Sequence, residues 1–262
     1  MEVGKYLERI NYQGGAEATI EVLNALQKKH LLSVPFENLD IYYKIPIGLN
    51  PGNIFEKVVI KRRGGFCYEL NSLFYELLRA IGFDVKMISA RVFNQQQKVF
   101  SPEFDHLAII ANLDSVDHLV DVGFGEFTFL PLKIELNTTQ NDERGKFRID
   151  KYNEVYYQVS KQADENWTPE YMFTLKERDL NEFSEMCHYN QSSPQSHFTQ
   201  NTFCSLPTEN GRITVSTSKI KVTEANSITE SPITGEQEFL LALEKYFHIR
   251  PDSIKLANTS LA

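Results

Sequence analysis

A cysteine follows a pair of glycines at the predicted start of an amphipathic helix. In RRGGFCYELN, Cys67 comes two residues after Gly64-Gly65, and apolar residues then recur at helical spacing as far as Gly82. Unpaired N–H groups and the helix dipole at such a position stabilise an anion, which lowers the pKa of a thiol. The glycines permit a tight turn and the close approach of another molecule. Cys67 is therefore a candidate nucleophile.

The alternative is that Cys67 only packs. It shares a helix face with Leu70 and Phe74, and a free cysteine in a helix is more often a small buried hydrophobe than a reactive group. A nucleophile also needs a base and a group that orients the base. The choice between the two interpretations thus depends on residues elsewhere in the chain.

His106 and Asp121 are the candidates for these two roles. His106 opens the strand-like segment HLAIIANL, and Asp121 lies within HLVDVGFG among apolar residues. A carboxylate in that setting is costly unless it is paired. The alternatives are a structural histidine, and an acid that faces water on an edge strand or contacts Gly123 in a turn.

The predicted hairpin puts the two residues on one side of a sheet. If LDSVD pairs Leu113 with His118, His106 and Asp121 project to the same face. In that register Asp121 faces Ile110, about 13 Å along the strand from His106. The predicted register therefore leaves the pair apart, and contact requires a bulge, a shifted register or strong shear.

The elements that must position these residues change character near residue 85. The first part is predicted to be helical: AEATIEVLNALQKKHL is followed by SVPFENLD, where Pro35 interrupts the helix, and PGNIFEKVVIKR follows a Pro-Gly turn. The helix that begins near Cys67 is predicted to stop at Gly82. Short β-branched segments then predict strands in DVKMISARVF, HLAIIANL, HLVDVGF, NEVYYQVS, EYMFTLKE and GRITVSTSKIKVTE.

The remaining segments complete an α+β order of elements. The polar stretch 138–146 is predicted to be an exposed loop, and LNEFSEMCHYN a short helix. In TGEQEFLLALEKYF, Thr234 and Gln237 have the spacing of a capping box at the start of a last helix. Helices followed by strands and a mixed tail predict an α+β fold with several subdomains.

Composition excludes several classes of protein. The 262 residues, 42% of them hydrophobic, suffice for a substantial core, and the net charge of −8 argues against a general nucleic-acid binder. We find no segment of signal-peptide or membrane-spanning character and expect no membrane association. The three cysteines, Cys67, Cys187 and Cys204, have the spacing of neither a disulfide framework nor a zinc site, and no metal is expected. A reducing, cytoplasmic location is predicted.

Several motifs together resemble a known family. RRGGFCYELN resembles the nucleophile signature of the arylamine N-acetyltransferases of the bacterial type. PFENLD and DHLAIIANL…HLVDVGFG resemble two further motifs of that family in the expected order, and SSPQSHFTQNTFCSL a fourth. The likeness extends from about residue 30 to about residue 210.

The resemblance implies a fold and a reaction. It implies a helical domain at 1–85, a β-barrel domain at 86–185 and an α/β lid at 186–262, around a cysteine-protease-like triad of Cys67, His106 and Asp121. The implied reaction is ping-pong transfer from acetyl-CoA, a co-substrate rather than a bound cofactor, to an arylamine or arylhydrazine. It extends to O-acetylation of N-hydroxyarylamines and to a role in xenobiotic metabolism.

The resemblance also assigns residues around the triad. Phe36, Phe124 and Phe198 match positions that line the acceptor pocket, and Glu37, Arg63 and Asn71 match supporting positions. Backbone N–H groups near Cys67 and Tyr68 are expected to hold the oxyanion. Glu126, after Gly125, stands where many members have a small residue near the coenzyme, so its carboxylate is expected to repel phosphates.

Each assignment has an ordinary alternative. The aromatic residues could be core, Glu37 and Arg63 could form a surface ion pair of little value, and the basic run 61–63 could be a solvated helix face or a phosphate clamp. Cys187 and Cys204 are interpreted as structural.

Three rival functions use the same residues differently. A cysteine hydrolase or transglutaminase-like enzyme predicts an open peptide cleft and no dependence on CoA. An amide synthase predicts poor turnover of acetyl-CoA and a preference for larger acyl donors. A non-catalytic relative that binds aromatic ligands predicts an unreactive Cys67.

Overall fold

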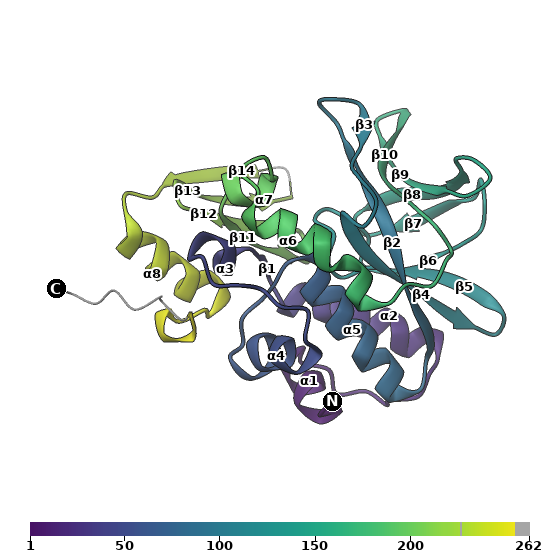
Figure 1. Cartoon of the computed structure of the whole chain (residues 1–262), viewed down its shortest axis with the longest axis horizontal. Coiled ribbons are helices and arrows are strands. Elements are labelled where there is room, and N and C mark those ends of the chain that lie inside the picture. Colours follow the sequence, from purple (N-terminus) through teal and green to yellow (C-terminus); the bar gives the residue numbers. More distant parts are fainter. Residues whose placement is uncertain (226, 255–262) are drawn as a thin grey trace.

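The computed structural model describes residues 1–225 and 227–254 and arranges them in three consecutive regions (Figure 1). The first region is helical, with α1 Val3–Arg9, α2 Ile20–Ser33, α3 Leu39–Tyr42, α4 Pro51–Phe55, a π-helical turn η1 Glu56–Ile60 and α5 Cys67–Ile81. A barrel-like sheet follows, and a smaller sheet with a last helix completes the chain (Figure 1). The predicted α+β fold class is confirmed.

Helix α5 carries Cys67 as its first residue. At its start, the backbone N–H of Phe66 donates to Glu69 Oε2 at 3.2 Å, which is the side-chain half of a capping box. The helix ends where predicted, because Gly82 has a φ of 108°, a left-handed conformation that favours glycine. One apolar core contains its buried stripe together with Leu107 and Ile109 of strand β4 (His106–Leu113); the stripe consists of Leu70, Leu73, Phe74, Leu77 and Leu78.

The central region is one antiparallel sheet. Its strands are β2 Asp84–Asn94, β3 Val99–Phe100, β4 His106–Leu113, β5 Val116–Val120, β6 Leu132–Lys133, β7 Thr139–Asp142, β8 Gly145–Lys151, β9 Tyr157–Ala163 and β10 Asn166–Phe173. The strand order is β6-β5-β4-β2-β10-β9-β8-β7, with β3 paired to β2. The end strands meet through Gln140, whose side chain accepts the N–H of Lys133 and donates to its carbonyl, both at 2.8 Å. These bonds make the sheet nearly a closed barrel.

The predicted register of the β4–β5 hairpin is wrong by two residues. Leu113 pairs with Val116 rather than with His118, so the connection is the two-residue turn Asp114-Ser115. Both turn residues have a positive φ, 51° and 65°, as a type I′ turn requires. The shift preserves the side of the sheet to which each residue points. It also moves Asp121 about 7 Å closer to His106 along the strand than the predicted register did.

The polar stretch 138–146 is not a loop, which corrects the sequence prediction. Its first half is strand β7, which pairs with β8 from Thr139–Arg148 to Asp142–Gly145. The Asp142 carboxylate accepts the backbone N–H groups of Phe129 and Leu130 at 3.0–3.1 Å. The segment is polar because β7 is a strand at the edge of the sheet. Its Asp142 side chain also anchors the chain at Phe129 and Leu130, which follow the β4–β5 hairpin.

The C-terminal region contains the 3₁₀ turns η2 Leu180–Phe183 and η3 Pro251–Ser253, helices α6 Ser184–Ser192, α7 His197–Gln200 and α8 Glu236–Phe247, and strands β11 Phe203–Thr208, β12 Gly211–Ser216, β13 Lys219–Glu224 and β14 Ser227–Pro232. Strand β1, Phe36–Glu37, from the helical region pairs with β11 and completes this sheet. The predicted capping box between Thr234 and Gln237 is wrong, because the backbone N–H and the hydroxyl of Thr234 both donate to the Glu238 carboxylate instead. Within the described residues, no helix is long and apolar enough to cross a membrane.

The predicted domain boundaries cut through regular elements. The first, between residues 85 and 86, lies within β2, and the second, between 185 and 186, lies within α6. Strand β1 also joins the helical region to the C-terminal sheet. The division at these positions stays a prediction.

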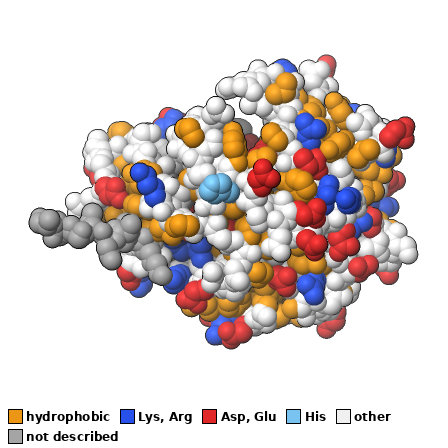
Figure 2. All heavy atoms as spheres, viewed as in Figure 1, with side chains coloured by type: hydrophobic (Ala, Val, Ile, Leu, Met, Phe, Trp, Pro, Cys, Tyr) orange, Lys and Arg blue, Asp and Glu red, His pale blue; other side chains and the backbone are white. Residues whose placement is uncertain are grey.

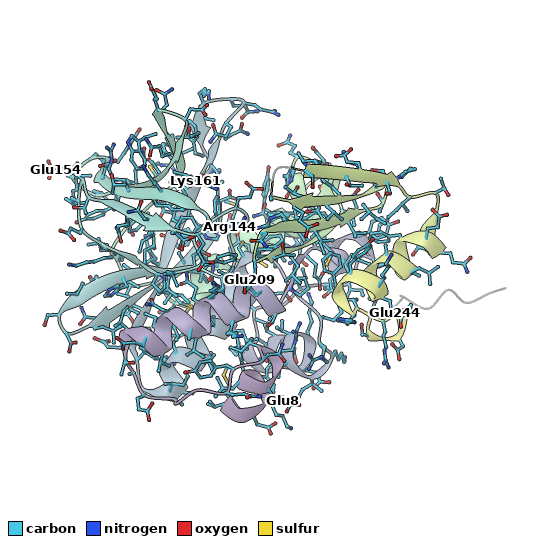
Figure 3. The ribbon with its side chains drawn as sticks, turned by 180° about the vertical axis from the view of Figure 1, so that it is seen from behind. Glu8, Arg144, Glu154, Lys161, Glu209 and Glu244 are labelled. Atoms are coloured by element: carbon cyan, nitrogen blue, oxygen red, sulfur yellow. The ribbon has the colours of Figure 1, made fainter. Side chains whose placement is uncertain are left out.

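Polar contacts join the barrel to the smaller sheet on the face seen from behind. Arg144 Nη1 donates to the carbonyl of Gly211 at 3.3 Å, and Figure 3 shows Arg144 where the two sheets approach each other. Nearby, Lys28 of α2 pairs with Glu143 at 2.7 Å and with Glu209 at 3.4 Å. These contacts tie all three regions together behind the site described below.

Candidate active site

The glycine pair places Cys67 by packing against the chain near strand β1. A Cβ atom on Gly64 would lie 1.9 Å from the carbonyl oxygen of Pro35, so no other residue fits there. The adjacent Gly65 carbonyl accepts the N–H of Glu37 at 2.9 Å. The close approach is thus made by the protein's own backbone, and not by another molecule as the sequence suggested. It fixes the start of α5 and hence the position of the thiol.

His106 and Asp121 are in direct contact. His106 Nε2 lies 2.7 Å from Asp121 Oδ2, and the two residues are 1% and 0% exposed. The register shift of the hairpin accounts for the contact that the predicted register could not make. Because Nε2 faces the carboxylate, Nδ1 is the ring nitrogen left to exchange a proton with another group.

The Asp121 carboxylate is fully bonded within the protein. Besides His106, it accepts from Asn71 Nδ2 at 2.8 Å, from the N–H of Gly123 at 2.9 Å and from the hydroxyl of Tyr171 at 3.1 Å. The turn contact to Gly123, considered above as an alternative to a functional role, is present together with the bond to His106. These four donors satisfy both oxygens of the buried carboxylate and fix its orientation.

Asn71 links the helix to the two strands. It lies one helical turn after Cys67, and its Nδ2 also donates to the carbonyl of Leu107 at 2.6 Å. Its Oδ1 accepts the N–H of Val122 at 2.9 Å. A Cβ atom on Gly123 would lie 2.7 Å from Asn71 and 2.8 Å from Cys67 Cα, so this glycine permits the strand to reach the helix.

Burial opposes ionisation of the thiol. Burial raises the pKa of Cys67 well above its usual value, and the carboxylates of Asp105 and Asp121 raise it further. A hydrogen bond from the backbone of Tyr68 lowers the pKa, as expected at a helix start, but it is the smaller effect. A thiolate is stable here only with a cation beside it, and a protonated His106 held by Asp121 can supply that charge.

Helix α6 braces the residue before His106. The hydroxyl of Tyr68 donates to the carbonyls of Phe104 and Asp105 at 2.9 and 3.1 Å. Asn190 of α6 donates to the same hydroxyl and to the Asp105 carboxylate, both at 3.1 Å. The Asp105 carbonyl oxygen is 4.0 Å from Cys67 Sγ. The side chain of Tyr68 thus holds the segment before His106, in addition to the hydrogen bond that its backbone makes to Cys67.

The Glu37–Arg63 pair is buried and is not a surface ion pair. Arg63 is 2% exposed and donates to Glu37 Oε1 at 2.8 Å and to Asp40 Oδ1 at 2.7 Å. Although burial acts in the opposite direction, these carboxylates raise the pKa of Arg63. Lys57 pairs with Asp40 at 2.7 Å and with Glu69 at 2.9 Å. Of the basic run, Arg63 is therefore neither a solvated residue nor a phosphate clamp.

Cys67 and His106 line one cavity of about 760 Å³. It lies between the tip of the β2–β3 hairpin and the segment around α7, where Figure 2 shows the surface hollowed. The aromatic residues on its walls are Phe36, Phe93, Phe124, Tyr189, Phe198 and Phe203. A cavity of this size with apolar walls suits a small planar ligand.

The aromatic residues form two walls. Phe36 stacks on Phe198 and on Phe203, with ring centroids 6.1 and 5.7 Å apart. In a second group, Phe124 packs edge-to-face with the His106 ring, with ring centroids 5.3 Å apart. All three phenylalanines expected from the resemblance line the cavity, and Phe203 adds a fourth that the sequence analysis missed.

Gly125 and Glu126 lie at the cavity beside two cationic side chains. Arg212 Nη2 donates to the Gly125 carbonyl at 2.5 Å, and Lys161 Nζ donates to that of Glu126 at 3.3 Å. Arg212 is also near enough to the Glu126 carboxylate for the two charges to attract each other. The repulsion of phosphates by Glu126 stays a prediction.

Sequence reasoning missed four polar residues of the site: Asp105, Tyr171, Asn190 and Arg212. Asp105 offered a signal, since it directly precedes His106 and is an acid at a strand start. Tyr171 lay in a correctly predicted strand, but nothing local indicates that β10 pairs with β2 and so reaches Asp121.

Comparison with known proteins identifies relatives across nearly the whole chain. A family model described as N-acetyltransferase matches residues 19–256. The human protein named arylamine N-acetyltransferase 1 is 30% identical over 273 residues, which cover 95% of this chain and 94% of the relative. The arylamine N-acetyltransferase of Escherichia coli K12 is 31% identical over 212 residues, covering 80% of this chain and 75% of the relative.

Solved structures agree in fold. An arylamine N-acetyltransferase from Bacillus cereus superimposes with a TM-score of 0.89 at 25% identity, covering 95% of this chain and 99% of that one. That structure is described as revealing a unique Cys-His-Glu catalytic triad. The carboxylate bonded to His106 here belongs to an aspartate, Asp121.

Proposed function

Because this chain belongs to the arylamine N-acetyltransferase family, we propose that it transfers the acetyl group of acetyl-CoA to an arylamine or arylhydrazine through Cys67. The proposal rests on one observation. Cys67 and His106 line the same cavity, and His106 is hydrogen-bonded to the buried Asp121. A thiol, a base and a group that orients the base are the parts that nucleophilic acyl transfer requires.

The first half-reaction forms a thioester on the enzyme. His106 Nδ1 takes the proton of the Cys67 thiol, and Sγ attacks the carbonyl carbon of acetyl-CoA. The new bond joins Sγ to this carbon, and the bond from the carbon to the sulfur of CoA breaks. The CoA thiolate leaves with the proton from His106, so that acetyl-Cys67 and neutral histidine remain.

The second half-reaction reverses these roles. The nitrogen of the acceptor attacks the acetyl carbon and forms the new amide bond, while His106 takes a proton from this nitrogen. The bond from the carbon to Cys67 Sγ breaks, and the proton returns to the thiolate. Splitting the transfer into two steps lets one cavity receive donor and acceptor in turn.

The surrounding residues have supporting roles in this mechanism. Asp121 fixes the histidine ring and stabilises its positive charge, and Asn71 and Tyr171 hold the carboxylate in place. Glu37 and Arg63 brace the start of α5. Backbone N–H groups near Cys67 and Tyr68 bind the developing oxyanion.

The aromatic walls favour flat acceptors. Phe36, Phe124 and Phe198 bound a space that can hold an aromatic ring and exclude water from the thioester. The same space admits an N-hydroxyarylamine, so O-acetylation belongs to the proposal. Neither a metal nor a permanently bound cofactor takes part in it. We also propose a cytoplasmic location, which keeps the three free cysteines reduced.

The rival functions have less support. Cysteine hydrolases and amide synthases could use the same three residues, but the relatives found across the chain carry acetyltransferase names. The buried His106–Asp121 pair, at the cavity that Cys67 also lines, favours catalysis over binding alone.

Glu126→Gln is expected to lower the KM for acetyl-CoA about two- to fivefold with little change in kcat. The carboxylate is exposed at the cavity, and an interaction of a partly exposed charge with the coenzyme phosphates is worth up to about 1 kcal/mol. Steady-state kinetics at fixed acceptor concentration measure this. Glu154→Gln, on a distant turn of the barrel (Figure 3), is the matched control. Equal KM values for the two variants would mean that Glu126 does not face the coenzyme.

A chromatographic assay tests the activity itself. Purified protein is incubated with acetyl-CoA and an arylamine, and both CoA release and acetylated amine are measured. We expect equal amounts of the two products and parallel double-reciprocal lines, as a ping-pong mechanism requires. Release of CoA without acetylated amine would instead indicate a hydrolase.

A further inference from the structure

The charged side chains of the active-site cavity are unevenly distributed. Its lining includes two acidic residues, Asp105 and Glu126, and one arginine, Arg212. The histidines His106 and His197 also line it. Two carboxylates and one guanidinium therefore face a ligand that enters the cavity. Their positions relative to the thiol decide which ligand charges are tolerated.

Glu126 has cations beside it. Arg212 contacts the carbonyl of the preceding residue, and Lys161 contacts the carbonyl of Glu126. Burial and the neighbouring Arg144 lower the pKa of Arg212 to about 10, while the Glu126 carboxylate acts in the opposite direction. Arg212 remains a cation at neutral pH. The negative charge of Glu126 is thus offset at this part of the cavity.

Asp105 has no such compensation from its bonding partner. Its Oδ1 accepts from the neutral side-chain amide of Asn190 at 3.1 Å. Asn190 is itself held by Ser196, whose hydroxyl contacts the Asn190 carbonyl and side-chain oxygens at 3.0 and 3.1 Å. The carboxylate is therefore held in position by a neutral donor and not by a cation.

Asp105 is also the acid of the cavity wall that is adjacent to the reacting atoms. It directly precedes His106 and lines the same cavity, and its carboxylate is near enough to Cys67 for its charge to raise the pKa of the thiol. Asp121, the other carboxylate near the thiol, is fully buried behind His106 and does not line the cavity. A bound acceptor consequently experiences the charge of Asp105 at short range.

We propose that Asp105 selects the acceptor by charge: its carboxylate accepts an N–H of the incoming neutral amine or hydrazine and disfavours arylamines that carry a carboxylate. The nitrogen becomes positive as it attacks the thioester, so an adjacent carboxylate stabilises the transition state more than the bound substrate. An acceptor carboxylate held in the same cavity is repelled. This inference rests on the proposed acetyltransferase function.

The test compares two acceptors that differ in charge. The enzyme is first loaded with acetyl-CoA, and the rates at which 4-aminobenzamide and 4-aminobenzoate discharge acetyl-Cys67 are then measured in single turnovers. We expect the neutral amide to react at least about tenfold faster than the anion, and Asp105→Asn to reduce that ratio roughly tenfold. This is the interaction of two unit charges about 6 Å apart at an effective dielectric constant of about 40, between the values for a protein surface and for bulk water.

Asp114→Asn is the matched control. It removes one negative charge from the exposed turn at the far end of β4, where asparagine also accepts the positive φ. In this variant, the ratio of the rate with 4-aminobenzamide to the rate with 4-aminobenzoate should equal that of the unchanged protein. The ratio compares two acceptors on one acetylated enzyme, so any effect of Asp105 on thiol reactivity cancels.

A measurement on the unchanged protein keeps the inference testable if the Asp105 variant does not fold. About 1 M salt reduces the Debye length to about 3 Å and should bring the two rates closer together. Acetyl-Cys67 that forms normally but shows no preference for the amide, or a ratio that Asp105→Asn leaves unchanged, overturns the role of Asp105 alone. Absence of acetyl-Cys67 overturns the proposed function, and this inference with it.

Discussion

Cys67→Ala is expected to abolish acetyl-enzyme formation and to reduce arylamine acetylation by roughly 10⁴-fold or more, the range seen when a covalent nucleophile is removed. The side chain is 3% exposed and small, so its loss leaves a minor cavity and the fold should persist. Product formation by chromatography measures the first effect, and thermal unfolding measures the second.

The chain supplies a matched control for this variant. Cys187 is also buried and helical, but it does not line the cavity. Cys187→Ala should therefore form the acetyl-enzyme at nearly the rate of the unchanged protein. Acetylation activity retained by Cys67→Ala would contradict the mechanism outright.

Asp121→Asn is expected to lower the rate of acetyl transfer by roughly 10³–10⁴-fold, as loss of the aspartate does in hydrolases with an analogous triad. An amide can still accept from Asn71 and Gly123, so most of the local structure survives. It cannot stabilise a protonated His106. Because burial already raises the pKa of the Cys67 thiol, the thiolate then loses the cation on which it depends.

Alkylation of Cys67 by iodoacetamide at neutral pH measures this effect without any acetyl donor. The Asp121→Asn variant should react much more slowly than the unchanged protein and should keep a similar unfolding temperature. Asp117→Asn, on the same hairpin, removes a charge from a partly exposed position and serves as the control. An unchanged alkylation rate in Asp121→Asn would show that this carboxylate does not activate the thiol.

The elements with strong local signals were predictable. Helix α5 has a long apolar period and a glycine at its end, and both its start near Cys67 and its stop at Gly82 agree with the structure. The strand character of β4 and β5 was equally clear. Local patterns of this kind depend on residues a few positions apart, which a single sequence contains in full.

The contact between His106 and Asp121 was not predictable, because it depends on a turn without a strong signal. Asp114-Ser115 adopts the left-handed conformation that Asn-Gly or Asp-Gly usually indicates, and the sequence analysis assumed a longer connection instead. A change of two residues in register decides whether the histidine reaches the carboxylate. The residue types pointed to the pair, but their distance required the structure.

The remaining differences come from pairing over long sequence separations. Gly64 is a glycine because Pro35 lies against it, and Arg63 is buried because Glu37 and Asp40 surround it. Tyr171 joins the site because β10 lies beside β2. None of these neighbours is indicated by spacing along the chain.

The central claim is that Cys67 carries the acetyl group between donor and acceptor. Intact-protein and peptide mass spectrometry after mixing the purified chain with acetyl-CoA alone, and then with an arylamine, tests it most directly. We expect one acetyl group, on the peptide that contains Cys67, and its loss when the amine is added. No acetyl group on a Cys67 that still alkylates rapidly, or an acetyl group that the amine does not remove, would contradict the claim.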